Sequence, residues 1–246
     1  MRISSLALLL LAAPALFADT LSDLRGALEH LKGQDPVRAK VEIRTWNKNG
    51  EGKKSKERVS AGQVQVEDGP QGLRLGWTAA QMQSARKDAQ AKAVDPEAAT
   101  PNLETLKALD AAEASRLLSY ADSLGLMLQG AQLLEDKPEA YQGKPARMLL
   151  LKPEARFSAE DKDIIKSFEV SLKVWVGPDG IPLGLEKTLR FKGSKFLISF
   201  RGSQAESTSL ARVGNRLVAM QCTKETSGSG MGMTSQGKTV SNLTLF

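Results

Sequence analysis

The segment LKVWVGPDGIPL, residues 172–183, decides the fold class, because it holds two strand patterns joined by a tight turn. Apolar residues at every second position from 170 to 176 alternate with polar residues and Trp175, which is typical of a strand with one buried face. The sequence Gly177-Pro178-Asp179-Gly180 favours a turn. We therefore predict an antiparallel hairpin in this segment.

More strand patterns with short links lie on both sides of this hairpin. On the C-terminal side we predict strands at 182–192, 195–202, 206–214 and 215–223, a Gly/Ser-rich loop at 227–237 and a last strand at 238–246. The links contain glycine, as in Gly202-Ser203. On the N-terminal side, strands at 131–135 and 146–152 flank the turn 141–145, and Ser158 caps a short helix to about Ile165. This succession predicts an antiparallel meander.

The N-terminal part of the chain changes from a helix pattern to a strand pattern. Leucines at 21, 24, 28 and 31 form one stripe of an amphipathic helix. From Val37 to Ile43 apolar residues alternate with charged ones, as in a strand with one wet face. Two further strands are predicted at 59–67 and near 73–77, and a shift in the alternation near Gly62 indicates a bulge.

Residues 78–130 have a different composition from the strands around them. They are rich in Ala, Gln, Lys and Glu, which favour helices. We predict a helix at about 78–93 with a thin apolar stripe, and a better amphipathic stretch at 102–130 that breaks near Asp110. Helices grouped apart from strands are typical of an α+β fold and not of an alternating α/β fold.

Residues 1–18 have the pattern of a cleavable secretory signal peptide. Arg2 precedes an apolar run at 6–13, and small residues follow up to Ala18. The run is shorter than the roughly 20 residues that span a membrane. We therefore predict cleavage after about Ala18, with Ala13-Pro14-Ala15 as an alternative cut and a retained anchor as the alternative to cleavage. The mature chain, 19–246, is expected to be a single periplasmic α+β domain without a transmembrane segment.

Residues that could carry chemistry are few. His30 is the only histidine and Cys222 the only cysteine, so zinc sites and Ser-His or Cys-His catalysis lack their usual partners. Cys222 lies in a strand pattern and is expected to be a small buried side chain. The run Gly228-Ser229-Gly230-Met231-Gly232 looks like a phosphate loop, but no helix follows it. We therefore expect no enzymatic activity, no cofactor and no metal.

The net charge of +6 raises the question of an anionic partner. Basic residues gather in the first predicted hairpin tip, at Lys48, Lys53, Lys54, Lys56 and Arg58. Acidic residues dilute this cluster and no aromatic residues interleave with it, so we do not expect a nucleic acid as partner. A solvated hairpin tip is the main interpretation, and a weak contact with anionic membrane headgroups is the alternative.

Three features together resemble the LolA/LolB-type superfamily of periplasmic lipoprotein carriers. They are the N-terminal helix that leads into the strand 37–46, the hairpin YQGKPARMLLLKP at 141–153, and the segment LKVWVGPDGIPL at 172–183. In that superfamily a curved antiparallel sheet, an incomplete barrel, wraps around helices and can enclose acyl chains. The resemblance implies such a sheet here, packed on the N-terminal helix and on the central helical insertion 78–130, which is longer than expected of the carriers.

A half-barrel of this kind needs something apolar against its concave face. The candidate lining residues are Leu183, Leu185, Leu189, Phe191, Phe196, Ile198 and Phe200. Each buried methylene of an acyl chain would contribute about 0.8 kcal/mol. The leading hypothesis is an exported, non-enzymatic binding protein for a lipid, a lipoprotein or another hydrophobic ligand. The alternative is a cell-envelope interaction or assembly module, in which these residues form a closed core and bind no ligand.

Overall fold

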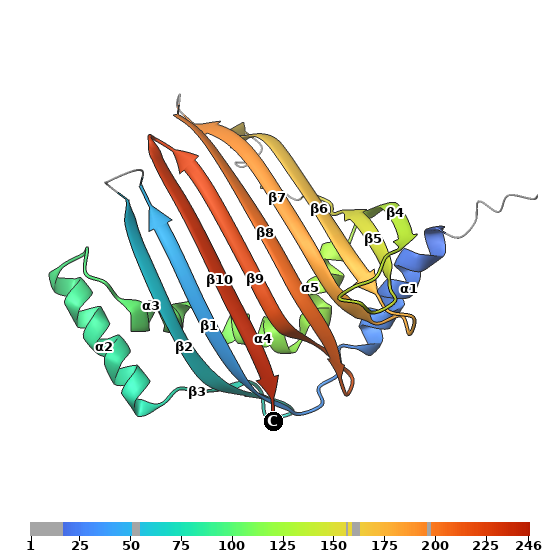
Figure 1. Ribbon diagram of the computed structural model, residues 1–246, viewed down its shortest axis with the longest axis horizontal. Coiled ribbons are helices and arrows are strands. Elements are labelled where there is room, and N and C mark those ends of the chain that lie inside the picture. Colours follow the sequence, from blue (N-terminus) through green and yellow to red (C-terminus); the bar gives the residue numbers. More distant parts are fainter. Residues whose placement is uncertain (1–16, 51–54, 156, 159–162, 196–197) are drawn as a thin grey trace, which may run out of the picture.

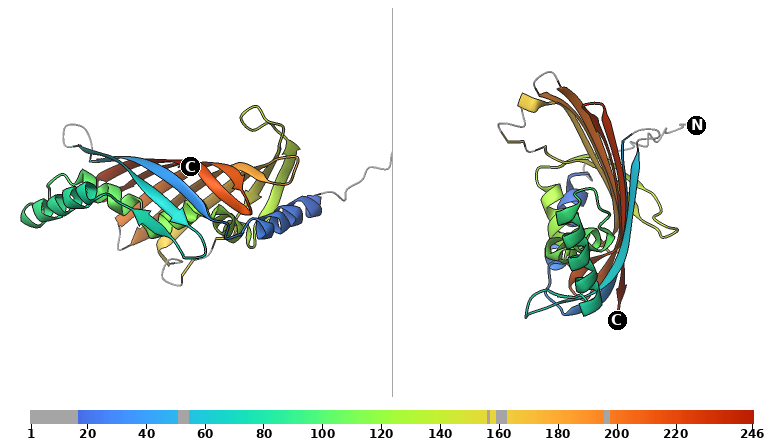
Figure 2. Two further views of the ribbon diagram at one scale, coloured as in Figure 1. Left: turned by 90° about the horizontal axis from the view of Figure 1, so that it is seen from below. Right: turned by 90° about the vertical axis from the view of Figure 1, so that its left-hand side faces the viewer.

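The computed structural model of the 246-residue chain describes residues 17–50, 55–155, 157–158, 163–195 and 198–246. In these residues ten strands form one antiparallel sheet, in the order β3-β2-β1-β10-β9-β8-β7-β6-β5-β4 (Figure 1). Its edge strands β3 and β4 do not pair with each other, so the sheet stays open. The structure confirms the predicted α+β class, with a curved antiparallel sheet packed on helices (Figure 2).

The strands vary in length from a three-residue edge strand to the long central ones. They are β1 (Val37–Asn49), β2 (Lys56–Asp68), β3 (Arg74–Gly76), β4 (Gln132–Pro138), β5 (Arg147–Lys152), β6 (Ile165–Val176), β7 (Pro182–Lys195), β8 (Ile198–Val213), β9 (Arg216–Gly230) and β10 (Met233–Leu245). The helices in the described residues are α1 (Phe17–His30), α2 (Ala79–Val94), α3 (Pro101–Ala108), α4 (Ala111–Leu118) and α5 (Tyr120–Leu128).

The central helical segment crosses the sheet from one edge to the other. It leaves β3 at one edge and returns at β4, the opposite edge, from which the chain runs back as a meander to β10 beside β1 (Figure 1). The connection must span the whole sheet, so α3, α4 and α5 lie across its concave face. Helix α1 packs on α5 and β4, and α2 packs on α3 beyond the β2 edge.

The buried apolar residues lie between the concave face and the helices. The predicted stripe of α1 is buried, with Leu24 and Leu28 at most 2% exposed. The alternation in β1 is also confirmed, because Val37, Ala39, Val41 and Ile43 are buried and the residues between them are not. The predicted break at Asp110 is confirmed as the start of α4, where its side chain accepts a hydrogen bond from the backbone NH of Glu113 at 2.9 Å. Cys222 is buried, as predicted.

Three predicted interruptions of the C-terminal strands are wrong. The predicted break between 192 and 195 lies within β7, which runs to Lys195. Gly202-Ser203 does not separate two strands, because β8 continues through it from Ile198 to Val213. Most of the predicted loop 227–237 is also strand, since β9 extends to Gly230 and β10 begins at Met233. Gly202 lies within the sheet because the ring of Phe191 occupies the space above it, and a Cβ at Gly230 would be 3.1 Å from Cβ of Phe200.

Some shorter predictions also differ from the structure. No register shift occurs at Gly62, which pairs regularly with Ile43, while the methyl group of Thr105 in α3 fills the space beside it. A further break, at Ser119, separates α4 from α5. Of the short helix predicted to run from Ser158 to about Ile165, part lies outside the described residues, and Ile165 itself begins β6.

Candidate functional site

In the orientation of Figure 1, the lower part of the concave face is closed by the chain's own helices, and the turn between β9 and β10 lies at the upper end. Leu117 and Leu118 of α4 and Leu124 and Leu128 of α5 are at most 1% exposed and pack in the core against the sheet. Leu185 of β7 belongs to the same closed core and is fully buried. These buried side chains occupy the space between the helices and this part of the sheet.

A layer of ion pairs lies above the closed core, between α4, α5 and the sheet. The guanidinium of Arg116 donates two hydrogen bonds to the carboxylate of Glu113, at 2.8 and 2.9 Å, and lies 3.1 Å from Oε1 of Glu206. The hydroxyl of Tyr120 donates to the same Glu206 oxygen at 2.7 Å. Lys224 of β9 lies 3.1 Å from both oxygens of Glu113. Each charge is paired with an opposite one, which is what a stable buried network requires.

The pKa values in this layer follow from the pairing. Burial alone would raise the pKa of Glu206, but the hydrogen bond from Tyr120 and the positive charge of Arg116 outweigh it and hold that pKa below its ordinary value of 4.5. The pKa of Glu113 is lowered in the same way, because Arg116 and Lys224 outweigh burial. Burial raises the pKa of Tyr120, so its hydroxyl stays protonated as a donor. The layer therefore consists of stable ions and contains no free base.

These lowered pKa values predict a loss of stability in acid. A carboxyl group whose pKa is lower in the folded state stabilises that state above its unfolded pKa, and this contribution disappears as the pH falls through the folded pKa. We expect Glu206→Gln to reduce the free energy of unfolding at neutral pH, and this difference from the wild type to shrink below about pH 4.5. Urea titrations across that pH range measure it, with the exposed Glu225→Gln as control. A difference that is independent of pH would contradict the prediction.

Above the ion-pair layer, β7 and β8 each contribute one phenylalanine and one glycine, and each phenylalanine pairs with the glycine of the other strand. Phe191 lies opposite Gly202, and Phe200 lies opposite Gly193. Each ring lies over the glycine of the facing strand, so that a Cβ at Gly202 would be 2.5 Å from Cζ of Phe191. The two ring centroids are 6.3 Å apart, in an edge-to-face arrangement. The glycines are therefore required for the close packing of the rings.

Beyond these rings, the upper end of the concave face forms an open apolar groove. Its volume is about 710 Å³, and its apolar lining comes from Ile198, Phe200, Met231 and Met233. Met231 is 71%, Met233 64% and Ile198 40% exposed, although these side chains gather at one place. Gly228 and Gly230 form part of the floor, so a ligand can approach the backbone there. The remaining lining is Asn49, Gly50, Lys56, Ser229, Thr234 and Ser235.

The predicted lining residues are spread over different levels of the sheet. Ile198 and Phe200 line the groove. Leu183, Leu189 and Phe191 are half-buried and do not line it, and Leu185 lies in the closed core. Phe196 lies outside the described residues. Met231 and Met233 were missed because their segment has the composition of a loop.

Two further features of the described residues bear on the kind of site. No three His, Cys, Asp or Glu side chains there are grouped so that they could hold a metal ion. None of the described helices has both the length and the apolar character needed to cross a membrane. His30 is exposed in the last turn of α1, away from the groove.

Comparisons of the chain with protein-family models, with curated proteins and with solved structures find no match. The resemblance to the lipoprotein-carrier superfamily therefore stays a prediction, and the site's own geometry is the basis for the function proposed below.

Proposed function

We propose that the protein binds a hydrophobic ligand, such as the acyl chain of a lipid or of a lipidated protein, in the groove at the upper end of its concave face. The observation that carries this proposal is the gathering of Ile198, Phe200, Met231 and Met233 around an open volume of about 710 Å³. A volume of this size is typical of small-molecule sites. Exposed apolar side chains that gather at one place are a common mark of a binding surface.

The chemistry of the groove suits a flexible chain better than a rigid polar molecule. Met231 and Met233 have unbranched, adaptable side chains that can follow ligands of different shape. The glycine floor lets an acyl chain lie against the sheet, and each methylene removed from water contributes about 0.8 kcal/mol. About ten methylenes would therefore offset a large part of the cost of immobilising the ligand.

Lys56 gives the groove a cationic rim. Its ammonium group is 2.6 Å from the carboxylate of Glu97, and both side chains are 66% exposed. An exposed pair of this kind contributes little to stability, so an anionic headgroup can replace Glu97 at low cost. The preferred ligand in this proposal is an amphipathic molecule with an acyl chain and an anionic or polar head.

The proposed place of action is the periplasm, after cleavage of residues 1–18. The support is the signal pattern around Arg2 and the apolar run 6–13, together with the resemblance to periplasmic lipoprotein carriers. In this proposal the protein is non-enzymatic and transports or senses a lipid or a lipoprotein.

A second function is favoured by the closed lower part of the concave face. Leu117, Leu118, Leu124 and Leu128 fill the place that an enclosed ligand would need. An envelope interaction module would use the same exposed cluster at Met231 and Met233 to dock a protein. A pull-down from envelope extract that enriches one protein, without any acyl species, would favour this second function.

The effect of one methionine substitution tests the location of the site. Met233→Gln keeps the length of the side chain but places an amide against the ligand, where an unpaired amide costs about 1–3 kcal/mol. We expect the affinity for a fluorescent fatty-acid probe to fall roughly tenfold. Met82→Gln is the matched control, because Met82 is 50% exposed on α2 and does not line the groove. Equal affinities of the two variants would contradict this location.

A further inference from the structure

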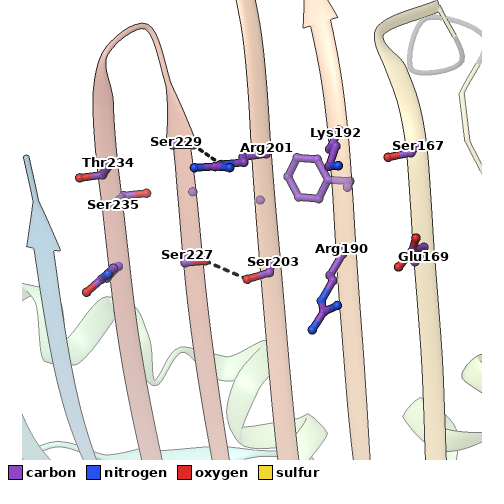
Figure 3. A pocket seen from close by; sticks show the side chains of 14 residues that line it. Ser167, Glu169, Arg190, Lys192, Arg201, Ser203, Ser227, Ser229, Thr234 and Ser235 are labelled. Carbon is purple, nitrogen blue, oxygen red and sulfur yellow. Dashed lines mark hydrogen bonds between the residues drawn. The ribbon is translucent and has the colours of Figure 1, made fainter.

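The opposite, helix-free face of the sheet carries a second groove, which is polar. It extends across the upper parts of β6 to β10 and has a volume of about 490 Å³ (Figure 3). Its outward side chains form two rows across the strands, in register with one another. The upper row is Ser167, Lys192, Arg201, Ser229 and Thr234, and the lower row is Glu169, Arg190, Ser203, Ser227 and Gln236.

The upper row contains a cross-strand pair of like charges, whereas other cross-strand charge pairs on this face have opposite signs. Lys192 lies directly opposite Arg201, and like charges in this position destabilise a sheet. Elsewhere on the same face, cations face acids: Lys238 lies 2.8 Å from Glu225, Lys48 lies 3.2 Å from Glu57, and Lys173 is opposite Glu186. Arg190 in the lower row lies opposite Glu169, whereas within the described part of the chain no carboxylate lies opposite Arg201 or Lys192. A local cost of this kind is typical of functional sites.

Hydroxyl groups surround these cations. Nε of Arg201 donates to Oγ of Ser229 at 2.9 Å, and the hydroxyls of Ser203 and Ser227 are 2.8 Å apart. The first bond holds the guanidinium in place on the sheet and leaves its outer NH groups for a ligand. Hydroxyls donate and accept hydrogen bonds, so they suit a ligand that is itself rich in hydroxyls.

The groove continues into a neighbouring hollow that contains an aromatic side chain. This hollow has a volume of about 370 Å³ and shares Ser203, Ser227 and Gln236 with the first. Its far side is Trp46 of β1, whose indole gives a flat apolar surface of the kind on which sugar rings pack. From Lys192 on β7 to Trp46 on β1 the groove covers five adjacent strands, which is about 19 Å across the sheet at 4.8 Å per strand; Trp46 also lies further along the strands, level with Lys238.

We propose that this continuous groove binds an anionic oligosaccharide. Its acidic group lies at Lys192 and Arg201, and its sugar rings extend over the serine hydroxyls towards Trp46. A flat anionic membrane is a poorer match, because Lys192 and Arg201 lie at one end of a hollow and the other end holds the neutral ion pair of Lys238 and Glu225. The apolar groove opens on the opposite face of the sheet. The two grooves share Gly228, Ser229, Thr234 and Ser235, but Lys192, Arg201 and Trp46 line only the polar one.

Isothermal titration calorimetry of the full chain tests the proposal. The probes are a galacturonic acid hexasaccharide, a heparin-derived hexasaccharide and, as neutral control, maltohexaose. We expect at least one acidic hexasaccharide to bind and maltohexaose to bind much more weakly. Lys192→Glu should weaken the binding roughly tenfold or more, because it removes a charge-assisted hydrogen bond. Trp46→Ala should weaken it as well. Lys40→Glu, which makes the same charge change on this face away from the groove, should not.

A stability measurement separates a binding role of Lys192 from a structural one. Lys192→Glu puts an acid opposite Arg201, so its thermal unfolding midpoint should equal or exceed that of the wild type although binding is lost. A lower midpoint would mean that Lys192 supports the fold. Failure of both acidic hexasaccharides to bind would overturn the proposal. So would binding only to phosphatidylglycerol vesicles, which would make this face a membrane contact.

Discussion

Asp68→Ala is expected to lower the free energy of unfolding by about 3–5 kcal/mol, because it leaves a buried arginine without its counter-charge. Arg216 is 2% exposed, and its Nη1 lies 2.5 Å from Oδ2 of Asp68 and 3.3 Å from Oγ of Ser119. These contacts join the end of β2, the start of β9 and the junction between α4 and α5. Nε of Arg216 already lacks a partner, so the guanidinium has no other strong contact to compensate.

The neighbouring residue provides the control for Asp68→Ala. Glu67 lies 3.2 Å from Arg38, but both side chains are exposed, so Glu67→Ala should cost no more than about 1 kcal/mol. Urea denaturation of both variants at neutral pH measures the two losses. A loss of similar size in both would show that Arg216 does not depend on Asp68.

Leu124→Ala is expected to lower the free energy of unfolding by about 2–5 kcal/mol. Leu124 of α5 is fully buried in the core between the helices and the sheet, so its truncation leaves a cavity. Leu126 is on the same helix but is 65% exposed, and Leu126→Ala should change the stability by less than about 0.5 kcal/mol. The same chemical change on one helix thus separates a core position from a surface position.

Calorimetric or urea unfolding of this pair tests whether α5 closes the lower part of the concave face. Two small losses would mean that the region near Leu124 is loosely packed and available to a ligand. In that case the binding site would extend below the ion-pair layer, and Leu185 would line it, as the sequence predicts.

The periodic parts of the fold were predictable from the sequence. The leucine stripe of α1 and the alternation from Val37 to Ile43 each fix which side chains face the core, because helices and strands have fixed periods. Asp110 was predictable as a helix boundary because its carboxylate caps the next helix. Nothing comparable marks Ser119, whose side chain makes no capping hydrogen bond to α5.

The errors come from residues whose role depends on a neighbouring strand. Gly202 has the signature of a turn, yet it lies within β8 because the ring of Phe191 on β7 needs the space. The shift near Gly62 arises only if Val59 is assigned to the core, whereas Val59 is 65% exposed beside Trp46 on the outer face. Such pairings join residues far apart in the sequence, so local patterns do not contain them.

The sequence predicted which face of the sheet carries the candidate site, but not which part of that face is left open by the helices. Alternation assigns Leu185 and Phe191 to the same face of β7, but it does not tell which level the helices cover. Leu185 proved to lie under the helices, and Ile198 and Phe200 beyond them. The outer groove was not predictable, because the cationic pair of Lys192 and Arg201 exists only through the register of β7 and β8.

Titration of the wild-type protein with a fluorescent fatty-acid probe tests directly whether the groove takes up an acyl chain, because the probe needs an open apolar groove to bind. We expect saturable binding at about one probe per chain, displaced by unlabelled fatty acid, and acyl species that co-purify with the protein in its native mass spectrum. A native mass spectrum of the bare chain alone, with no saturable uptake of the probe, would contradict it.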